Sequence, residues 1–259
     1  MGHERTGFLP KTKQWNDIVR QLSDYKGDNE SVKNITNDTL SCIRKTYEQM
    51  PYDESVTKAI KFLALISYSA KQTDQVSFLN QNGCTVDNKL SLFSLMNSAK
   101  NYIDTKTGSL ETNKIVRDAV LQAITTYQRK HTSEQLSLFG DQSDSVWKNV
   151  GSGAAFCELA RSFFAAFTDR QIKYYIERSA ASEIDNYAEL KSFSARIEQQ
   201  AEAISHHAFE TSKIMQSFAA GWFNKHAVNS IPSDKKVTDF LRNSFGKMRE
   251  EFRREADGQ

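Results

Sequence analysis

Four acidic or imidazole side chains recur at every fourth residue in the C-terminal half of the chain, a spacing that places residues on one helical face. They are Glu198, Glu202, His206 and Glu210. Carboxylates and imidazoles at this spacing bind metal ions in some helical bundles. The apolar residues Ile197 and Ala201 occupy the core-facing side of the same helix, which turns the acidic stripe outward. We therefore interpret the stripe as a solvated surface and expect no metal site.

Two further groups of residues could support chemistry, but neither has the surroundings that the chemistry requires. Asp185 with the run Glu-Leu-Lys at 189–191 resembles the carboxylate arrangement of metal-dependent nucleases, which normally lies on strands, whereas this stretch has helical spacing. The turn Gly-Ser-Gly at 151–153 precedes a helix but lacks the lysine and the preceding strand of a P-loop. His206 and His207 are expected on an ordinary helix surface. The sequence thus predicts no catalytic residues, no cofactor and no enzymatic activity.

A more specific pattern lies in the polar stretch 132–146, which contains a single apolar knot. The knot is the pentapeptide Gln135-Leu136-Ser137-Leu138-Phe139. At all five positions it resembles the Gln-Leu-(Ser or Asp)-Leu-Phe peptide by which bacterial replication and repair proteins bind the β sliding clamp. The resemblance covers these five residues alone. It implies the clamp as a protein partner, and an association with DNA through the clamp.

Such a peptide binds in an extended conformation, so that alternate side chains reach different pockets. Leu138 and Phe139 would fill an apolar pocket, where each contributes about 1.5–3 kcal/mol. Leu136 would occupy a shallower site, the Gln135 amide would pair with backbone groups at the rim, and Ser137 would face solvent. The competing interpretation is that the apolar residues of the pentapeptide pack this stretch onto the protein's own core.

The composition is that of an ordinary globular protein. Hydrophobic residues make up 39% of the chain and charged residues 25%, with a net charge of +2, so charge alone does not indicate a nucleic-acid partner. The three cysteines, Cys42, Cys84 and Cys157, are far apart and odd in number, which suits a reducing compartment. No apolar run approaches the roughly 20 residues of a membrane span. We expect a cytoplasmic protein that does not contact a membrane.

Apolar residues recur at helical spacing along most of the chain, and only three prolines interrupt the pattern. Thr12, Ser31 and either Asp53 or Ser55 are expected to begin the first three helices. Gly83 is expected to end a short helix. No stretch alternates long enough to build a sheet. The sequence therefore predicts an all-α fold, with helices in the N-terminal half near residues 12–25, 32–47, 56–66, 74–82, 88–103 and 112–130.

The C-terminal half shows two further helical patterns. Thr168, with Gln171 three residues later, has the form of a capping box, which predicts that a new helix begins there. Beyond it, apolar residues follow at alternating steps of four and three. They are Ile197, Ala201, Ile204, Ala208, Thr211, Met215, Phe218 and Trp222. This seam predicts one long heptad-patterned helix. A last helix is expected after Pro232.

These patterns predict two helical bundles, residues 1–131 and 150–259, joined by an exposed connector at 132–149 that carries the pentapeptide. The leading interpretation is a non-enzymatic adaptor that docks on the β sliding clamp in DNA replication, repair or defence. The main alternative is a structural subunit of a multiprotein complex, for example in anti-phage defence, whose seam at 197–222 and last helix bind other subunits. A third possibility is a helical enzyme or toxin with a site built from residues distant in sequence.

Overall fold

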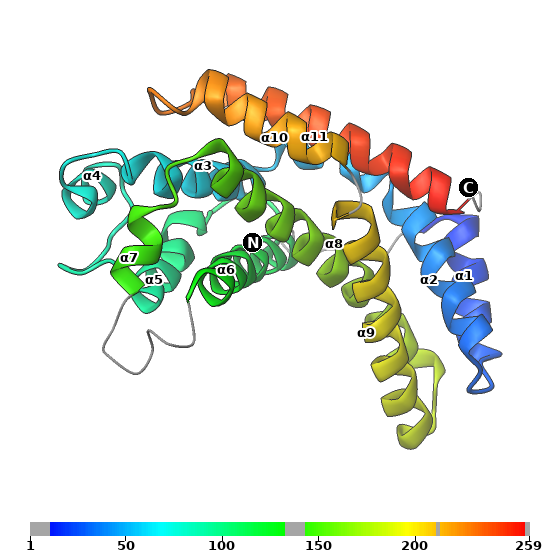
Figure 1. The fold of residues 1–259 in the computed structure, drawn as a ribbon. Helices are drawn as coiled ribbons and strands as arrows, with labels where there is room; N and C mark the ends of the chain where they lie inside the picture. Colours follow the sequence, from blue (N-terminus) through cyan, green and yellow to red (C-terminus); the bar gives the residue numbers. More distant parts are fainter. Residues whose placement is uncertain (1–10, 133–142, 211–212, 257–259) are drawn as a thin grey trace.

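The computed structural model describes residues 11–132, 143–210 and 213–256, and all regular structure within these ranges is helical (Figure 1). The predicted all-α fold is confirmed. Two 3-10 helices, η2 (Thr46–Glu48) and η3 (Met50–Tyr52), connect α2 to α3. The α-helices are α1 (Lys13–Ser23), α2 (Asn29–Ile43), α3 (Glu54–Ser69), α4 (Gln75–Gln81), α5 (Leu92–Ile103), α6 (Leu110–His131), α7 (Ser143–Lys148), α8 (Gly153–Glu183), α9 (Tyr187–Glu210), α10 (Lys213–His226) and α11 (Asp234–Ala256).

Side-chain caps fix the first residues of the N-terminal helices. Thr12 caps α1 by accepting a hydrogen bond from the backbone N–H of Trp15 at 3.1 Å, and Asp53 caps α3, as predicted. The second helix begins before Ser31, because Asp28 is its cap. Ser31 donates both its backbone N–H and its hydroxyl to the Asp28 carboxylate, each at 2.7 Å. A carboxylate accepts two such bonds at once, which explains why it caps the helix instead of Ser31.

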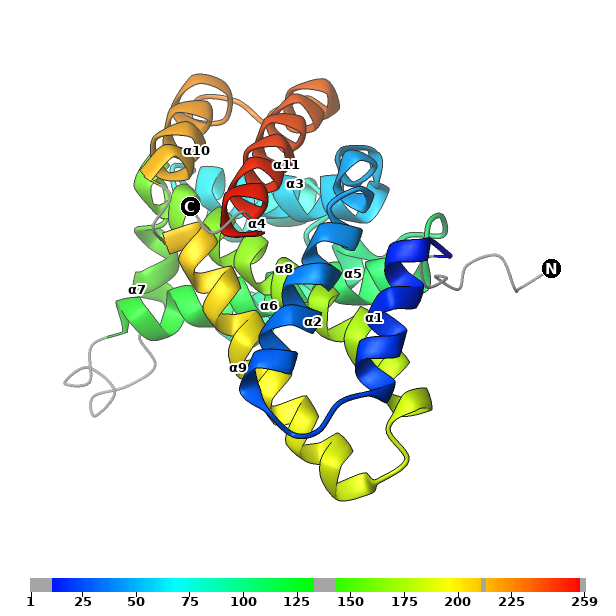
Figure 2. The same ribbon diagram turned by 90° about the vertical axis from the view of Figure 1, so that its right-hand side faces the viewer.

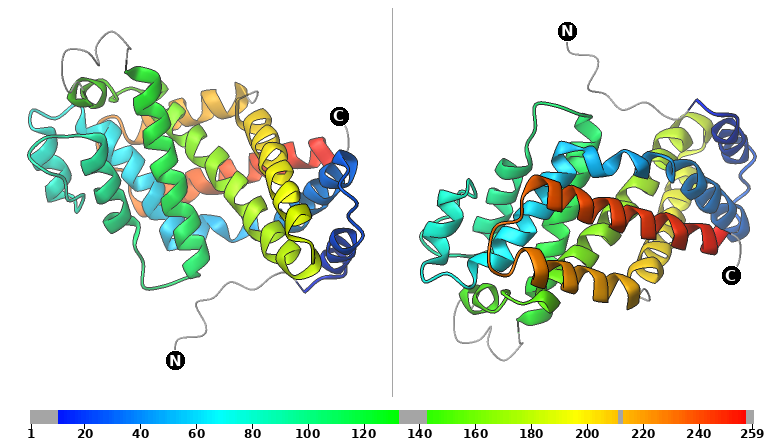
Figure 3. Two further views of the ribbon diagram at one scale, coloured as in Figure 1. Left: turned by 90° about the horizontal axis from the view of Figure 1, so that it is seen from below. Right: turned by 90° about the horizontal axis from the view of Figure 1, so that it is seen from above.

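The 31-residue helix α8 lies at the centre of the molecule. It packs most extensively against α6, α9 and α10, and it also contacts α1, α2 and α3 (Figures 1 and 3). A helix with neighbours on several sides must be apolar around most of its circumference. The sequence of α8 satisfies this requirement, since its buried residues are distributed along its length without a single apolar stripe.

Residues 153–183 form one continuous helix, so the predicted helix start at Thr168 is wrong. Thr168 is fully buried inside α8, where its hydroxyl oxygen lies 3.3 Å from the hydroxyl of Tyr47, which donates to it. Gln171 is buried as well, and its amide nitrogen lies 3.9 Å from the sulfur of Met50 in η3. Tertiary packing of these residues therefore outweighs the local capping signal.

Aromatic rings fix α10 and α11 onto α8. These two helices lie side by side across one face of the molecule (Figure 2). Phe156 of α8 stacks on Phe223 of α10 with ring centroids 5.0 Å apart, and Phe164 meets Phe245 of α11 edge-on at 5.5 Å. Such pairs contribute roughly 0.5–1.5 kcal/mol each beyond the burial of their area. The C-terminal helices are thus integral to the core.

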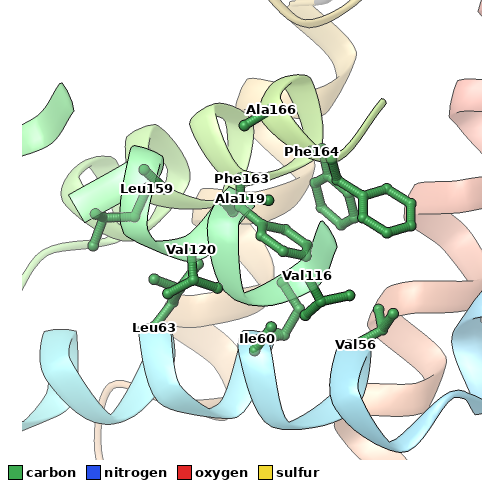
Figure 4. Packing of buried hydrophobic residues seen from close by; sticks show 14 of the residues in the cluster. Val56, Ile60, Leu63, Val116, Ala119, Val120, Leu159, Phe163, Phe164 and Ala166 are labelled. Carbon is green, nitrogen blue, oxygen red and sulfur yellow. The ribbon is translucent and has the colours of Figure 1, made fainter. Parts of the chain in front are cut away.

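Another side of α8 packs against α3 and α6 from the N-terminal half (Figure 4). Phe163 of α8 lies among Ile60 of α3 and Val116 and Val120 of α6, and all four are fully buried. One continuous cluster of buried apolar residues includes members from both halves of the chain. The structure therefore does not confirm a division into separate bundles at 1–131 and 150–259.

The connector and the heptad seam also differ from expectation. The predicted connector at 132–149 contains the helix α7. The seam at 197–222 spans two helices, α9 and α10, which run in different directions (Figure 1). This change of direction allows α10 to contact both α8 and α11. The structure thus places two helices where the heptad pattern predicted one.

Substituting Gly153 by alanine should lower the free energy of unfolding. Gly153 begins α8 where α10 passes close to it, and a Cβ there would lie 2.6 Å from Asn224 Oδ1 and 2.9 Å from the backbone oxygen of Ala220. The backbone oxygen of a packed helix cannot move aside as a flexible side chain can. We expect a loss of about 1–3 kcal/mol, measured by urea unfolding.

Gly221 of α10 and Gly246 of α11 are matched controls, because a Cβ at either position would meet nothing within 4 Å. Alanine at these positions should raise the free energy of unfolding by about 0.5–1 kcal/mol, since glycine is unfavourable inside a helix. An equal gain in stability at Gly153 would contradict the close approach of α8 and α10.

Candidate functional site

The candidate site is the part of the predicted connector that lies between α6 and α7, and from here on the word connector refers to this part. The structure describes both points where it joins the fold. The pentapeptide Gln135-Leu136-Ser137-Leu138-Phe139 lies within residues 133–142, outside the described part of the chain. The roles of these five residues therefore stay predictions. The described ends are Thr132, which follows α6, and Ser143, which begins α7. The contacts of α6 and α7 define how the connector is attached.

Hydrogen bonds at Thr132 end α6 at a defined point. The backbone N–H and the hydroxyl of Thr132 both donate to the backbone oxygen of Gln128, at 2.9 and 2.8 Å. The side-chain amide of Gln128 donates back to the Thr132 hydroxyl at 3.1 Å. These bonds use groups that would otherwise be unpaired at a helix end. The chain therefore enters the connector from a fixed position.

Glu158, near the start of α8, holds the last turn of α6. Its two carboxylate oxygens lie 3.2 Å from Lys130 Nζ and 2.9 Å from His131 Nε2. Burial acts to raise the pKa of the Glu158 carboxyl, but the hydrogen bonds from His131 and Lys130 outweigh it and lower this pKa below its usual value. The contacts with Lys130 and His131 thus favour the deprotonated, charged form of Glu158.

The other end of the connector is held by Trp147 of α7, whose side chain is fully buried. Its ring lies 5.6 Å from that of Tyr127 in α6. The side-chain amide of Gln75, at the start of α4, donates to the backbone oxygen of Trp147 at 3.0 Å. Burial, together with the Glu158 carboxylate, raises the pKa of Tyr127 to about 12, so this phenol stays neutral. Both ends of the connector are therefore tied to the same part of the core.

The acidic stripe on α9 has the surroundings of a surface. Glu198 is exposed and accepts a contact from Lys173 of α8 at 3.3 Å, and Glu202 is exposed. Lys173 also lies 3.1 Å from Asp169, whose pKa is raised because burial outweighs this ion pair. The side chains of His206, His207 and Glu210 lie outside the described set. Within the described residues, no group of three or more His, Cys, Asp or Glu side chains could hold a metal ion.

The other two candidate constellations have structural roles. Asp185 lies in the turn before α9, whose first backbone N–H groups are capped by Asn186 at 2.9 Å. Residues 189–191 follow on the exposed start of this helix, away from any strand. In the turn at 151–153, Ser152 caps α8 by accepting from the backbone N–H of Ala155 at 3.1 Å. Its glycines permit the close packing that surrounds the start of α8.

Sequence reasoning did not find an open polar groove of about 490 Å³ beside α8. Arg170 of α8 donates to the side-chain oxygen of Gln122 in α6 and, at 3.4 Å, to the backbone oxygen of Ala166. The groove has basic and acidic groups in equal number, so it has no clear charge preference. Because its walls come from α6, α8 and α9, no local sequence pattern could reveal it. The lining residues are Asp118, Leu121, Gln122, Thr125, Thr126, Arg129, Arg170 and Glu202.

Comparison with known proteins adds no functional assignment. No protein-family model, no curated protein and no solved structure matches this chain. None of the helices in the described ranges is long and apolar enough to cross a membrane. The connector and its attachment are therefore the features from which a function can be argued.

Replacing Glu158 by glutamine should weaken the attachment of α6 in a pH-dependent way. The pKa of Glu158 is lowered in the folded state, so its charge adds stability fully above pH about 4.5, the usual carboxyl value, and this contribution disappears as the pH falls through the lower folded pKa. We expect the variant to be less stable by a few tenths to about 1 kcal/mol at neutral pH. Urea unfolding across a pH series measures the difference.

The matched control is Glu198→Gln. The Glu198 carboxylate is more exposed than that of Glu158, so its charge should contribute less to the free energy of unfolding. If the deficit of the Glu158 variant were the same at pH 3 as at pH 7, the charge of the carboxylate would not be its cause. Hydrogen exchange at the backbone of Gln128 and Thr132 would then show whether the end of α6 is affected at all.

Proposed function

We propose that this protein is a non-enzymatic adaptor that docks on the bacterial β sliding clamp through Gln135, Leu136, Leu138 and Phe139, with Ser137 facing solvent. The observation that carries the proposal is the five-residue match in a polar connector. In this proposal the protein acts in the cytoplasm, in DNA replication, repair or defence. The helical body would be the part that is brought to the clamp.

The attachment of the connector supports this proposal. A peptide that binds a groove loses conformational freedom, and a segment tied at both ends has less freedom to lose than a free tail. The described anchors are the Thr132 bonds at one end and the buried Trp147 at the other. An extended chain covers about 3.3–3.6 Å per residue, so the stretch of sequence between Thr132 and Ser143 is long enough to reach only about 15 Å out and back. The clamp would therefore lie close to the ends of α6 and α7.

The alternative of an assembly subunit relied on faces that are occupied within this chain. Ile197 and Ala201 of α9 are fully buried by neighbouring helices, and Trp222 of α10 is buried as well. The apolar residues of α11, including Phe240 and Phe245, are buried as well. These described parts of the seam and of the last helix are not available to another subunit. A subunit role would need a different surface.

The test is binding of the full chain to a purified bacterial β clamp, measured by calorimetry without DNA. We expect a dissociation constant near micromolar, roughly −8 kcal/mol, as for a single short peptide. Replacing Leu138 and Phe139 together by alanine should weaken binding by more than about 100-fold, because each side chain contributes about 1.5–3 kcal/mol of burial.

The matched control is Ser137→Ala, which changes the solvent-facing residue and should leave the affinity within about twofold. A synthetic peptide of residues 131–144 serves as a reference for the isolated motif. Binding by the peptide without binding by the full chain would mean that the pentapeptide packs on its own core. If neither bound, the resemblance to clamp-binding peptides would carry no function.

A further inference from the structure

Four exposed basic residues lie near the C-terminal ends of different helices at the connector end of the molecule. They are Lys71 after α3, Arg129 in α6, Lys148 in α7 and Lys225 in α10. We refer to these four residues as the basic end. Within the described part of the chain, none of them forms an ion pair with a carboxylate. Their charges are therefore available to solvent or to a partner.

Contacts with the segment from α7 to the start of α8 bring these residues to one end. A Cβ on Gly151 would lie 3.3 Å from Lys71 Cγ, and Lys148 precedes this glycine in the same short segment. Lys225 follows Asn224, whose side-chain oxygen closely approaches Gly153. Figure 1 shows the ends of α3 and α10 on the same side of the molecule as α7.

Arg129 joins the same end through the neighbouring turn of α6. The next residue, Lys130, lies 3.2 Å from Glu158 in the first turns of α8. Tyr127, on the preceding part of the turn, contacts Trp147 of α7. Arg129 therefore lies beside the point where the connector leaves the fold at Thr132.

Asp118 and Glu202 line the same groove as Arg129, whereas two other described acidic groups near this end, Glu158 and Asp74, are already engaged. Glu158 contacts both Lys130 and His131. Asp74 lies next to Gln75, whose amide reaches Trp147, and it caps α4 by accepting two hydrogen bonds from Ser77. A cation at a helix C-terminus also stabilises that helix. That effect explains each residue singly, but it does not require four of them to gather at one end.

We infer that the basic end contacts the phosphate backbone of duplex DNA. This inference rests on the proposed function, which places the connector end against a protein ring that encircles a duplex. The short connector keeps the clamp within about 15 Å of its attachment points, so the basic end is the surface nearest to that duplex. Lysine and arginine side chains without base-reading partners bind phosphates independently of sequence. The partner surface is therefore the DNA backbone rather than particular bases.

Fluorescence anisotropy with a short labelled duplex of mixed sequence tests this surface on the full chain, with no clamp present. The wild-type protein should bind, and its affinity should fall steeply between about 50 and about 200 mM NaCl. The combined variant Lys71→Gln, Arg129→Gln, Lys148→Gln and Lys225→Gln should bind at least about tenfold more weakly at low salt. For this variant, the slope of the logarithm of the binding constant against the logarithm of the NaCl concentration should be smaller in magnitude by about three to four. Each lost phosphate contact reduces the slope by about one.

A matched control removes the same charge from the opposite end of the molecule, around α1 and α2. It combines glutamine substitutions at four exposed lysines, Lys13, Lys26, Lys33 and Lys45, and should bind within about twofold of the wild type. Circular dichroism melting of both variants confirms that each is folded. Absence of wild-type binding at low salt, or equal weakening by both variants, would overturn the inference. Clamp binding is measured without DNA, and DNA binding is measured without the clamp. Failure of the clamp proposal and failure of the DNA inference can therefore be told apart.

Discussion

Burial of α8 is the constraint on which the rest of the structure depends. Apolar side chains project from this helix in several directions, and no single neighbouring helix can bury all of them. Helices α3 and α6 cover one part, α9 and α10 another, and α1 and α2 a third. Because these partners come from both halves of the chain, the molecule has one continuous core. The phenylalanine rings of α8, α10 and α11 close that core on the remaining face.

The attachment of the connector follows from the same arrangement. Packing of α6 on α8 brings Glu158 to the last turn of α6, where it meets Lys130 and His131. The start of α8 also fixes the preceding segment, so that Trp147 is buried against Tyr127. Several helices end near this point, and their last turns carry cations. The positions of Thr132 and Trp147, and of the charges around them, therefore result from how the central helix is covered.

Local patterns in the sequence were sufficient to predict individual helices but not their assembly. Apolar spacing and the caps at Thr12 and Asp53 depend on neighbouring residues, so they could be recognised directly. Gly83 has the positive φ of 79° expected of a residue that ends a helix. The continuity of α8 through Thr168 depends on contacts with Tyr47, far away in the chain. No local signal reports such a contact.

At the candidate site too, the sequence reveals a local pattern but not the contacts between distant residues. The pentapeptide is visible only as a sequence pattern, whereas its attachment joins residues far apart, such as Gln75 and Trp147. The basic residues Lys71, Lys148 and Lys225 are likewise scattered along the chain and form no basic run. The nearly balanced net charge of +2 hides their gathering at one end. Composition alone therefore could not suggest it.

The central position of α8 has a consequence for synthesis of the protein. When α3 and α6 leave the ribosome, the helix that covers them has not yet been made, and translation at about 5–20 residues per second leaves their apolar faces in water for seconds. Stable tertiary structure can form only after residue 183, at the end of α8, has emerged. The nascent N-terminal half should therefore be a substrate for chaperones that bind exposed apolar helices, and neither half should be stable when expressed alone.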